Sequence, residues 1–291
     1  MANTHVEAEI ASQPSTWSEV ARRSRSAGSS LPTEGERVAF VGCGTSWFVA
    51  MAVAVLRESA GLGESDAFAA SEFPRNRAYD RVVAISRSGT TTEIIELLET
   101  IKKPTTLITA VGDSPAAAHA DQVVALHFAD ERSVVQTRFA TSVVALLRAH
   151  FGEDLTNVIA DAEEALQVDL SDLREVDQCS FVGTGWAIGL ANEAALKTRE
   201  AAQFWAEAYP AMDYRHGPIA IAQPGRLVWS LGGTPAGLAD EVAATGARFI
   251  DHDLDPLARL IVAQRFAVLL AVRKGLDPDH PRSLTRSVIL T

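Results

Sequence analysis

Short apolar runs alternate with longer amphipathic stretches along residues 37–152. The short runs are bounded by turn residues, as is typical of buried strands, whereas the longer stretches place apolar residues at helical spacing. Expected strands cover residues 37–42, 66–73, 81–86, 104–112 and 121–128. Expected helices cover residues 46–59, 90–102, 114–120 and 133–152. Strands that alternate with helices predict a parallel sheet with both faces covered.

The same alternation starts again after a helical stretch at residues 155–176. Expected strands follow at 179–185, 225–233 and 248–253, and expected helices at 186–208, 238–246 and 256–275. Both halves contain the motif Phe-Val-Gly-x-Gly, at residues 40–44 and again at 181–185. This self-similarity predicts two tandem α/β units.

The remaining segments complete the expected organisation. Residues 5–25 have a helical pattern that is interrupted near Pro14, and residues 27–36 are rich in turn formers. We therefore expect an N-terminal helical segment and linker, a first domain, a second domain with its leading helix, and a C-terminal tail that closes over the site. Their expected limits are 1–34, 35–155, 156–280 and 281–291.

Composition excludes several classes of function. The net charge of −11 argues against a general nucleic-acid binder, because phosphate backbones require a basic surface. No apolar stretch reaches the roughly 18 residues that span a bilayer, and the N-terminus has no signal-peptide pattern. Cys43 and Cys179 form neither a disulfide framework nor a metal-ligand spacing. We expect a cytoplasmic protein without membrane association, cofactor or metal.

The stretch "ISRSGTTTE" (85–93) places many hydroxyls between an expected strand and an expected helix. A helix N-terminus at the carboxyl edge of a parallel sheet attracts phosphate. Four hydroxyls in this stretch can donate to phosphate oxygens: Ser86, Ser88, Thr90 and Thr91. The alternative is a capping box from Thr90 to Glu93, which explains only one hydroxyl. A related turn, "GCGTSW" (42–47), follows the first strand and adds Thr45 and Ser46.

The stretch "GTGWAIG" (183–189) is a weak dinucleotide-binding signal. It leaves a nucleotide-dependent oxidoreductase as a minor hypothesis. That function requires an acidic ribose anchor at a strand end about 20 residues further on. Glu200 is near that spacing but lies in the middle of an expected helix, so this hypothesis is disfavoured.

Glu193, Lys197 and Glu200 are spaced i, i+4, i+7 and lie within roughly 60° on one helix face. The simplest interpretation is a solvated stripe of charges that stabilises the helix slightly. If the stripe faces a pocket instead, Glu200 becomes a candidate base and Lys197 a candidate stabiliser of negative charge. His216, before Gly217 and Pro218, is either a turn residue or an acid–base group suited to opening a sugar ring.

Five segments resemble, in order, the isomerase half of glucosamine-6-phosphate synthase, a tandem pair of SIS (sugar isomerase) domains. They are "FVGCGTSWF", "AISRSGTTTEII", "ERSVVQT", "EAALKTREAAQFWAEAYPAMDYRHGPIA" and "GLDPDHPRSLTRSV". The resemblance covers nearly the whole chain. It implies two three-layer αβα domains with parallel sheets of flavodoxin-like or Rossmann-like type.

The resemblance also implies roles for residues of this chain. Contacts to the phosphate and the sugar carry over to Thr45, Ser46, Ser86, Arg87, Ser88, Thr91 and Val134. The isomerisation base matches Glu200, and its neighbouring lysine matches Lys197. The ring-opening histidine matches His216; in the family the other subunit contributes it, which implies a homodimer.

Three departures from the family pattern limit the resemblance. No glutaminase half is recognised, so glucosamine synthesis from glutamine is not expected. The imine-forming lysine is replaced by Arg286, which cannot form an imine. Gln136 and Arg138 stand in a segment where the family has "ASTK".

We expect a small sugar phosphate as ligand. The leading function is aldose–ketose isomerisation, with or without loss of an amine as in amino-sugar-phosphate deaminases. The alternatives are a fructosyl-amino-acid-phosphate deglycase and a non-catalytic sugar-phosphate sensor.

Overall fold

The computed structural model describes residues 4–173 and 175–290 of the chain. The chain forms two compact units, each built from segments distant in sequence. The first unit comprises Ser15–Arg132, Gln136–Leu155 and Thr285–Thr291. The second unit comprises Met1–Pro14, Ser133–Val135 and Thr156–Leu284. The first helix of the chain thus groups with the later domain, and the last residues of the chain group with the earlier one.

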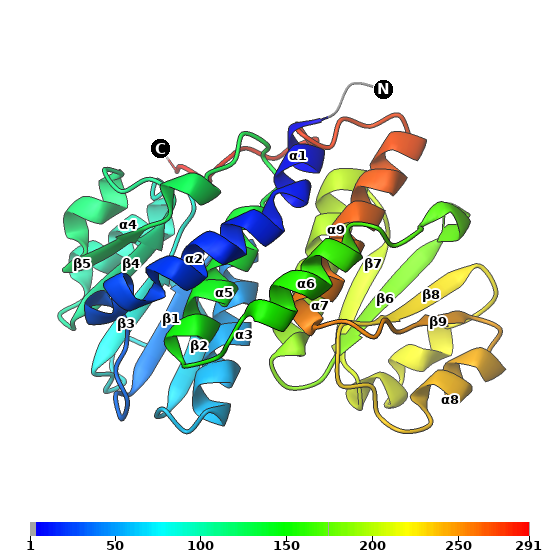
Figure 1. Cartoon of the computed structure of the whole chain (residues 1–291), viewed down its shortest axis with the longest axis horizontal. Coiled ribbons are helices and arrows are strands. Elements are labelled where there is room, and N and C mark those ends of the chain that lie inside the picture. The colour runs from blue at the N-terminus through cyan, green and yellow to red at the C-terminus, as the bar shows by residue number, and fades with distance from the viewer. Residues whose placement is uncertain (1–3, 174, 291) are drawn as a thin grey trace. The chain divides into compact units, whose positions relative to one another are not determined.

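The first unit contains a parallel sheet with the strand order β2-β1-β3-β4-β5 (Figure 1). Its strands are β1 (Val38–Gly42), β2 (Ser65–Ala69), β3 (Arg81–Ile85), β4 (Thr105–Thr109) and β5 (Gln122–Ala125). Its helices are α2 (Gln13–Ala27, beginning in the other unit), α3 (Thr45–Ser59), α4 (Thr92–Thr100) and α5 (Arg138–His150). Short 3-10 helices occupy Gly28–Ser30, Ala70–Glu72, Pro115–His119 and His127–Ala129.

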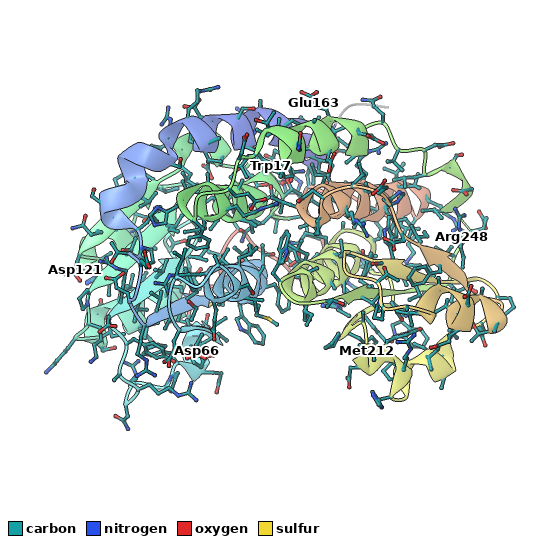
Figure 2. The ribbon with its side chains drawn as sticks, turned by 60° about the horizontal axis from the view of Figure 1, so that its bottom comes forward. Trp17, Asp66, Asp121, Glu163, Met212 and Arg248 are labelled. Atoms are coloured by element: carbon teal, nitrogen blue, oxygen red, sulfur yellow. The ribbon has the colours of Figure 1, made fainter. Side chains whose placement is uncertain are left out.

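Helices cover both faces of this sheet, as the apolar strand sequences predict. Strand β1 is buried along its whole length. On one side, Val82 and Ala84 pack in a cluster with Leu97 and Leu98 of α4. Elsewhere in the unit Trp17 of α2 is fully buried, and its Nε1–H donates to Thr141 Oγ1 of α5 at 3.0 Å. Figure 2 shows Trp17 inside the structure, whereas Asp66 and Asp121 lie at its periphery.

The second unit contains a parallel sheet with the order β7-β6-β8-β9. Its strands are β6 (Gln178–Gly183), β7 (Ala206–Pro210), β8 (Arg226–Ser230) and β9 (Arg248–Ile250). Its helices are α1 (His5–Ala11), α6 (Thr156–Ala165), α7 (Ala187–Ala202), α8 (Leu238–Ala244) and α9 (Pro256–Arg273), with 3-10 helices at Ser171–Leu173, Asp213–Arg215 and Pro218–Ile221. Helix α9 contacts both α6 and α7, beside which it lies in Figure 1.

The two sheets confirm the predicted pair of parallel α/β units. In each unit the first strand pairs with the next two strands along the chain, β1 with β2 and β3, and β6 with β7 and β8. This shared order explains why the Phe-Val-Gly-x-Gly motif occurs twice. In both units it marks a central strand and the turn into the following helix.

One expected helix was too long. The helix predicted at 186–208 ends at Ala202, and a strand that the pattern did not predict, β7, begins at Ala206. Gln203 adopts the left-handed conformation with φ of 47°, which ends the helix. The ammonium of Lys274 donates to the carbonyl oxygens of Ala202 and Gln203. A distant residue therefore helps to fix a boundary that the local sequence conceals.

Other boundaries also differ. The expected helix at 133–152 begins only at Arg138, and the one at 114–120 is a 3-10 helix over Pro115–His119. The helix expected at 155–176 ends at Ala165, although residue 174 of that prediction lies outside the described residues. The strand expected at 66–73 gives way to a 3-10 helix after Ala69.

Across residues 4–173 and 175–290, no helix combines the length and the apolar character that crossing a membrane requires.

Candidate active-site groups

Strands β1 and β3 are neighbours in the first sheet, so the loops that follow them lie at the same edge. A small cavity of about 30 Å³ lies there. It is lined by Cys43, Ser46, Ile85, Ser86, Arg87, Ser88, Thr91, Ile94, Gln136 and Arg286. Five of the residues predicted to contact a sugar phosphate are thus brought together within the first unit.

The serine-rich loop is the segment between β3 and α4, residues 86–91. Hydrogen bonds to its own serine hydroxyls stabilise it. Ser86 Oγ accepts a hydrogen bond from the Gly89 N–H at 3.2 Å. Ser88 Oγ accepts from the Thr90 N–H at 3.2 Å and from Thr90 Oγ1 at 2.9 Å. Each serine hydroxyl used as an acceptor also has a proton of its own. Ser86 and Ser88 are therefore suited to donate to an anion in the cavity.

Gly89 is required by the shape of this loop. Its φ is +63°, a conformation that favours glycine. A Cβ at this position would lie 1.9 Å from Ser114 Oγ, well inside contact distance. The glycine therefore allows the serine-rich loop to lie directly against the turn that follows β4.

The capping-box alternative for this loop is wrong. Helix α4 begins at Thr92 with Thr91 as its N-cap, and no side chain caps it. The Thr90 hydroxyl instead donates to Ser88 Oγ at 2.9 Å and is hydrogen-bonded to Ser287 Oγ at 2.8 Å. Glu93 faces the turn between β1 and α3, where the Cys43 thiol lies 3.6 Å from Glu93 Oε2. The hydroxyls thus organise the loop and do not cap the helix.

Two helices direct the positive ends of their dipoles towards this edge of the sheet. Helix α3 begins at Thr45, one residue before Ser46, and helix α4 begins directly after Thr91. Both Thr45 and Ser46 are buried. Helix N-termini stabilise anions without a lysine nearby, so the net negative charge of the chain does not exclude an anion at this edge of the sheet.

Arg87 belongs to the serine-rich loop, and its side chain forms a buried ion pair. Its Nη1 is 3.5 Å from Glu131 Oε2, and both side chains are almost completely buried. Burial lowers the pKa of the Arg87 guanidinium, and the nearby Glu131 carboxylate opposes that shift. The second oxygen of Glu131 accepts from the N–H groups of Thr137 (2.6 Å) and Arg138 (2.8 Å). Glu131 therefore joins the serine-rich loop to the start of α5.

The C-terminal tail is hydrogen-bonded to the same loop. Arg286 forms an ion pair with Asp130 and donates to the Glu131 carbonyl oxygen, while its own carbonyl accepts from Arg87 Nη2 at 3.3 Å. The Thr92 N–H donates to the Val288 carbonyl oxygen at 3.2 Å. Sequence reasoning identified the Arg286 substitution but not these bonds, which join residues far apart in the chain.

In the second unit, helix α7 brings Glu193, Lys197 and Glu200 together. Lys197 Nζ lies 2.5 Å from Glu200 Oε2 and 3.5 Å from Glu193 Oε1. Glu193 and Lys197 are each 1 % exposed, whereas the Glu200 side chain is 19 % exposed. The interpretation as a solvated stripe is therefore wrong. These three groups form a buried cluster in which Glu200 is the most accessible carboxylate.

Two further predicted residues belong to the second unit. His216 follows the 3-10 helix Asp213–Arg215, and its side chain is exposed. Val134 is half-buried, and its N–H donates to the Asp279 carbonyl oxygen at 3.0 Å. Neither residue belongs to the cavity lined by the serine-rich loop in the first unit.

Comparisons with known proteins identify the class. Residues 33–150 match the SIS domain family. Over 296 residues the chain is 29% identical to glutamine–fructose-6-phosphate aminotransferase [isomerizing] of Sulfolobus acidocaldarius, a match that covers 87% of this chain and 50% of the relative. The chain therefore contains a SIS domain and is homologous to these aminotransferases.

Solved structures extend the similarity to nearly all of the chain. Glucosamine-6-phosphate deaminase of Thermotoga maritima superposes with a TM-score of 0.83 at 25% identity, covering 99% of this chain and 100% of the other. The C-terminal domain of glucosamine-fructose-6-phosphate aminotransferase of Francisella tularensis gives 0.81 at 24% identity, covering 96% and 98%. The two-sheet architecture is therefore the SIS-type three-layer fold. The chain spans about half the length of the curated relatives it matches.

Proposed function

We propose that this chain is a phosphosugar isomerase that interconverts an aldose phosphate and a ketose phosphate. The observation that carries the proposal is the cluster on α7, where a buried ammonium contacts the partly accessible carboxylate of Glu200. A stability role alone does not require a buried cluster of this kind, because replacing buried ion pairs by apolar side chains is often neutral or stabilising. The homology to enzymes that act on sugar phosphates supports the same function.

We assign the roles as follows. The hydroxyls of Ser86, Ser88 and Thr91, with Thr45 and Ser46, hold the phosphate. Glu200 removes a proton from the carbon next to the carbonyl and returns it to the neighbouring carbon, so that the enediol collapses to the isomeric sugar. Lys197 stabilises the negative charge that develops on the substrate oxygen. Val134 contacts the sugar.

His216 is assigned to ring opening. An imidazole can accept and return a proton near neutral pH, as this step requires. Its exposure supports a role in completing the site of a partner subunit. We therefore propose a homodimer that acts on a small sugar phosphate in the cytoplasm.

A more specific proposal is that isomerisation is coupled to loss of an amine. The similarity to a glucosamine-6-phosphate deaminase supports it. The Arg286 guanidinium cannot form an imine with the ketose. Any amine loss must therefore proceed without an imine at this position.

A sugar-phosphate sensor without catalysis is the second candidate. The Arg286 ion pair with Asp130 favours it, because there the tail contributes structure and no nucleophile.

A thermal-shift screen tests the proposal and gives a ligand class. The screen compares hexose 6-phosphates, amino-sugar 6-phosphates and Amadori-type phosphates with the unphosphorylated sugars. Binding to the native state raises the melting temperature by mass action. Phosphorylated members of the panel should raise the melting temperature. If none of them does so, the proposal is contradicted.

A further inference from the structure

Gln136 lies two residues before α5 and lines the cavity of the serine-rich loop together with Ser86, Ser88 and Thr91. Its Oε1 is buried and has no hydrogen-bond partner within the part of the chain that the structure describes. Burying a carbonyl oxygen without a donor is unfavourable, and native proteins keep few such atoms. The position of this acceptor at the cavity indicates a ligand that supplies an O–H or N–H group to Gln136 Oε1.

The phosphate itself cannot satisfy this oxygen. A phosphate dianion presents acceptor oxygens only, so it is matched by the hydroxyls of Ser86 and Ser88 and by the helix N-termini. Gln136 Oε1 needs an O–H or N–H group. The ligand must therefore carry a phosphate and, within the reach of one small cavity, a hydrogen-bond donor.

The position of Gln136 indicates which donor is meant. Gln136 lines the same small cavity as Ser86 and Ser88, so a donor that reaches its Oε1 must lie close to the phosphate. In a hexose 6-phosphate the nearest candidate is the oxygen on C5, next to the carbon that bears the ester. In the pyranose and furanose rings of such sugars this oxygen is the ring oxygen, which has no proton. It becomes a hydroxyl only when the ring opens.

We propose that Gln136 is a specificity residue that accepts a hydrogen bond from the C5 hydroxyl of an open-chain phosphosugar. This inference rests on the proposed function and names the form of the substrate that the phosphate site selects. Gln136 would hold the ring-opened molecule after ring opening, because the ring-closed forms leave its carbonyl oxygen without a donor.

Calorimetric titration of the full chain tests the inference with three probes. These are a hexitol 6-phosphate, which cannot close a ring, a 1,5-anhydrohexitol 6-phosphate, which is locked in the ring form, and inorganic phosphate. The Gln136→Met variant keeps the length of the side chain but removes the amide. It should weaken binding of the hexitol phosphate about 3- to 10-fold, the effect of one neutral hydrogen bond. Its affinity for the other two probes should be unchanged.

Further outcomes separate this inference from its alternatives. If the variant loses affinity equally for all three probes, Gln136 acts on the phosphate or on the loop. If its affinity for the hexitol phosphate is unchanged, Gln136 has no role. Either result overturns the inference. The ligand-free melting temperature of Gln136→Met should not fall, because its Oε1 has no bond to lose. If that variant does not fold, the parent alone remains decisive, since it must prefer the hexitol phosphate to the ring-locked probe. A parent that binds none of the probes would refute the proposed function as well.

Discussion

Lys197 Nζ lies 2.5 Å from Glu200 Oε2, one turn further along α7, and 3.5 Å from Glu193 Oε1, one turn back. One ammonium thus separates two carboxylates on a buried helix face. Without it, the buried Glu193 carboxylate would lose its cation, which is strongly unfavourable. The cluster therefore holds the Glu200 carboxylate beside an ammonium and close to solvent, while its neighbours are buried.

Replacement of Lys197 by methionine should lower the free energy of unfolding by about 3–5 kcal/mol, because it leaves buried carboxylates without their cation. Arg248→Met is the matched control within the same unit. The Arg248–Asp172 pair is half-exposed, and Figure 2 shows Arg248 at the surface, so its loss should cost about 0–1 kcal/mol. Urea unfolding of both variants measures the difference. Equal midpoints for the two variants would mean that the cluster does not stabilise the fold.

Changing Ser86 and Ser88 together to alanine should weaken sugar-phosphate binding by about 1.5–3 kcal/mol for each charge-assisted hydrogen bond lost. Unphosphorylated sugars should bind weakly to the parent and to the double variant alike. Both serines also accept bonds within the loop, so circular dichroism must show that the variant remains folded. A folded double variant with the parent's affinity for its phosphosugar would remove these hydroxyls from the phosphate site.

The Cys43 thiol should resist alkylation. Burial and the adjacent Glu93 carboxylate raise the pKa of this thiol from its ordinary value of 9.0 to about 12. Only the thiolate reacts, so a raised pKa means slower reaction near neutral pH and in mildly alkaline buffer. Replacing Glu93 by glutamine removes one cause of the shift and should speed the reaction with iodoacetamide, monitored by mass spectrometry. A parent Cys43 that reacts as fast as a free cysteine peptide would show that the thiol is not protected.

The sequence predicted the layers of the fold because parallel strands buried on both faces produce short, continuous apolar runs. It did not predict β7, because Ala206 and its neighbours continue the alanine-rich composition of α7. The helix ends through the left-handed backbone of Gln203 and the Lys274 ammonium, 71 residues further along the chain. Such long-range contacts leave no local signal.

The candidate site was predicted unevenly for the same reason. The density of hydroxyls in the serine-rich loop is a local feature, so the anion site could be expected from sequence. Spacing placed Glu193 and Lys197 on one helix face but could not show that they are buried, because an exposed stripe has the same pattern. The pairing of Glu131 with Arg87, and the bonds of the tail to Thr90 and Thr92, became visible only in the structure.

Subunit mixing tests the homodimer and the role of His216 together. Glu200→Gln and His216→Asn should each abolish most activity when pure. If His216 acts in the partner's site, a mixed dimer contains one site with both changes and one site with neither. Random mixing should then restore about one quarter of the parent activity, since half of the dimers are mixed and each has one intact site. Without any recovery on mixing, His216 would have to act within its own subunit or not at all.

Proton exchange at a substrate carbon tests the central claim most directly. In heavy water, the parent enzyme should incorporate deuterium from solvent into one of the hexose or amino-sugar 6-phosphates that it binds, as followed by NMR. Glu200→Gln should lower the rate of incorporation about 10²–10⁴-fold, the usual contribution of a general base, while the phosphosugar still binds. If the parent incorporates no deuterium into any phosphosugar that it binds, the chain is not an isomerase and the sensor function takes its place.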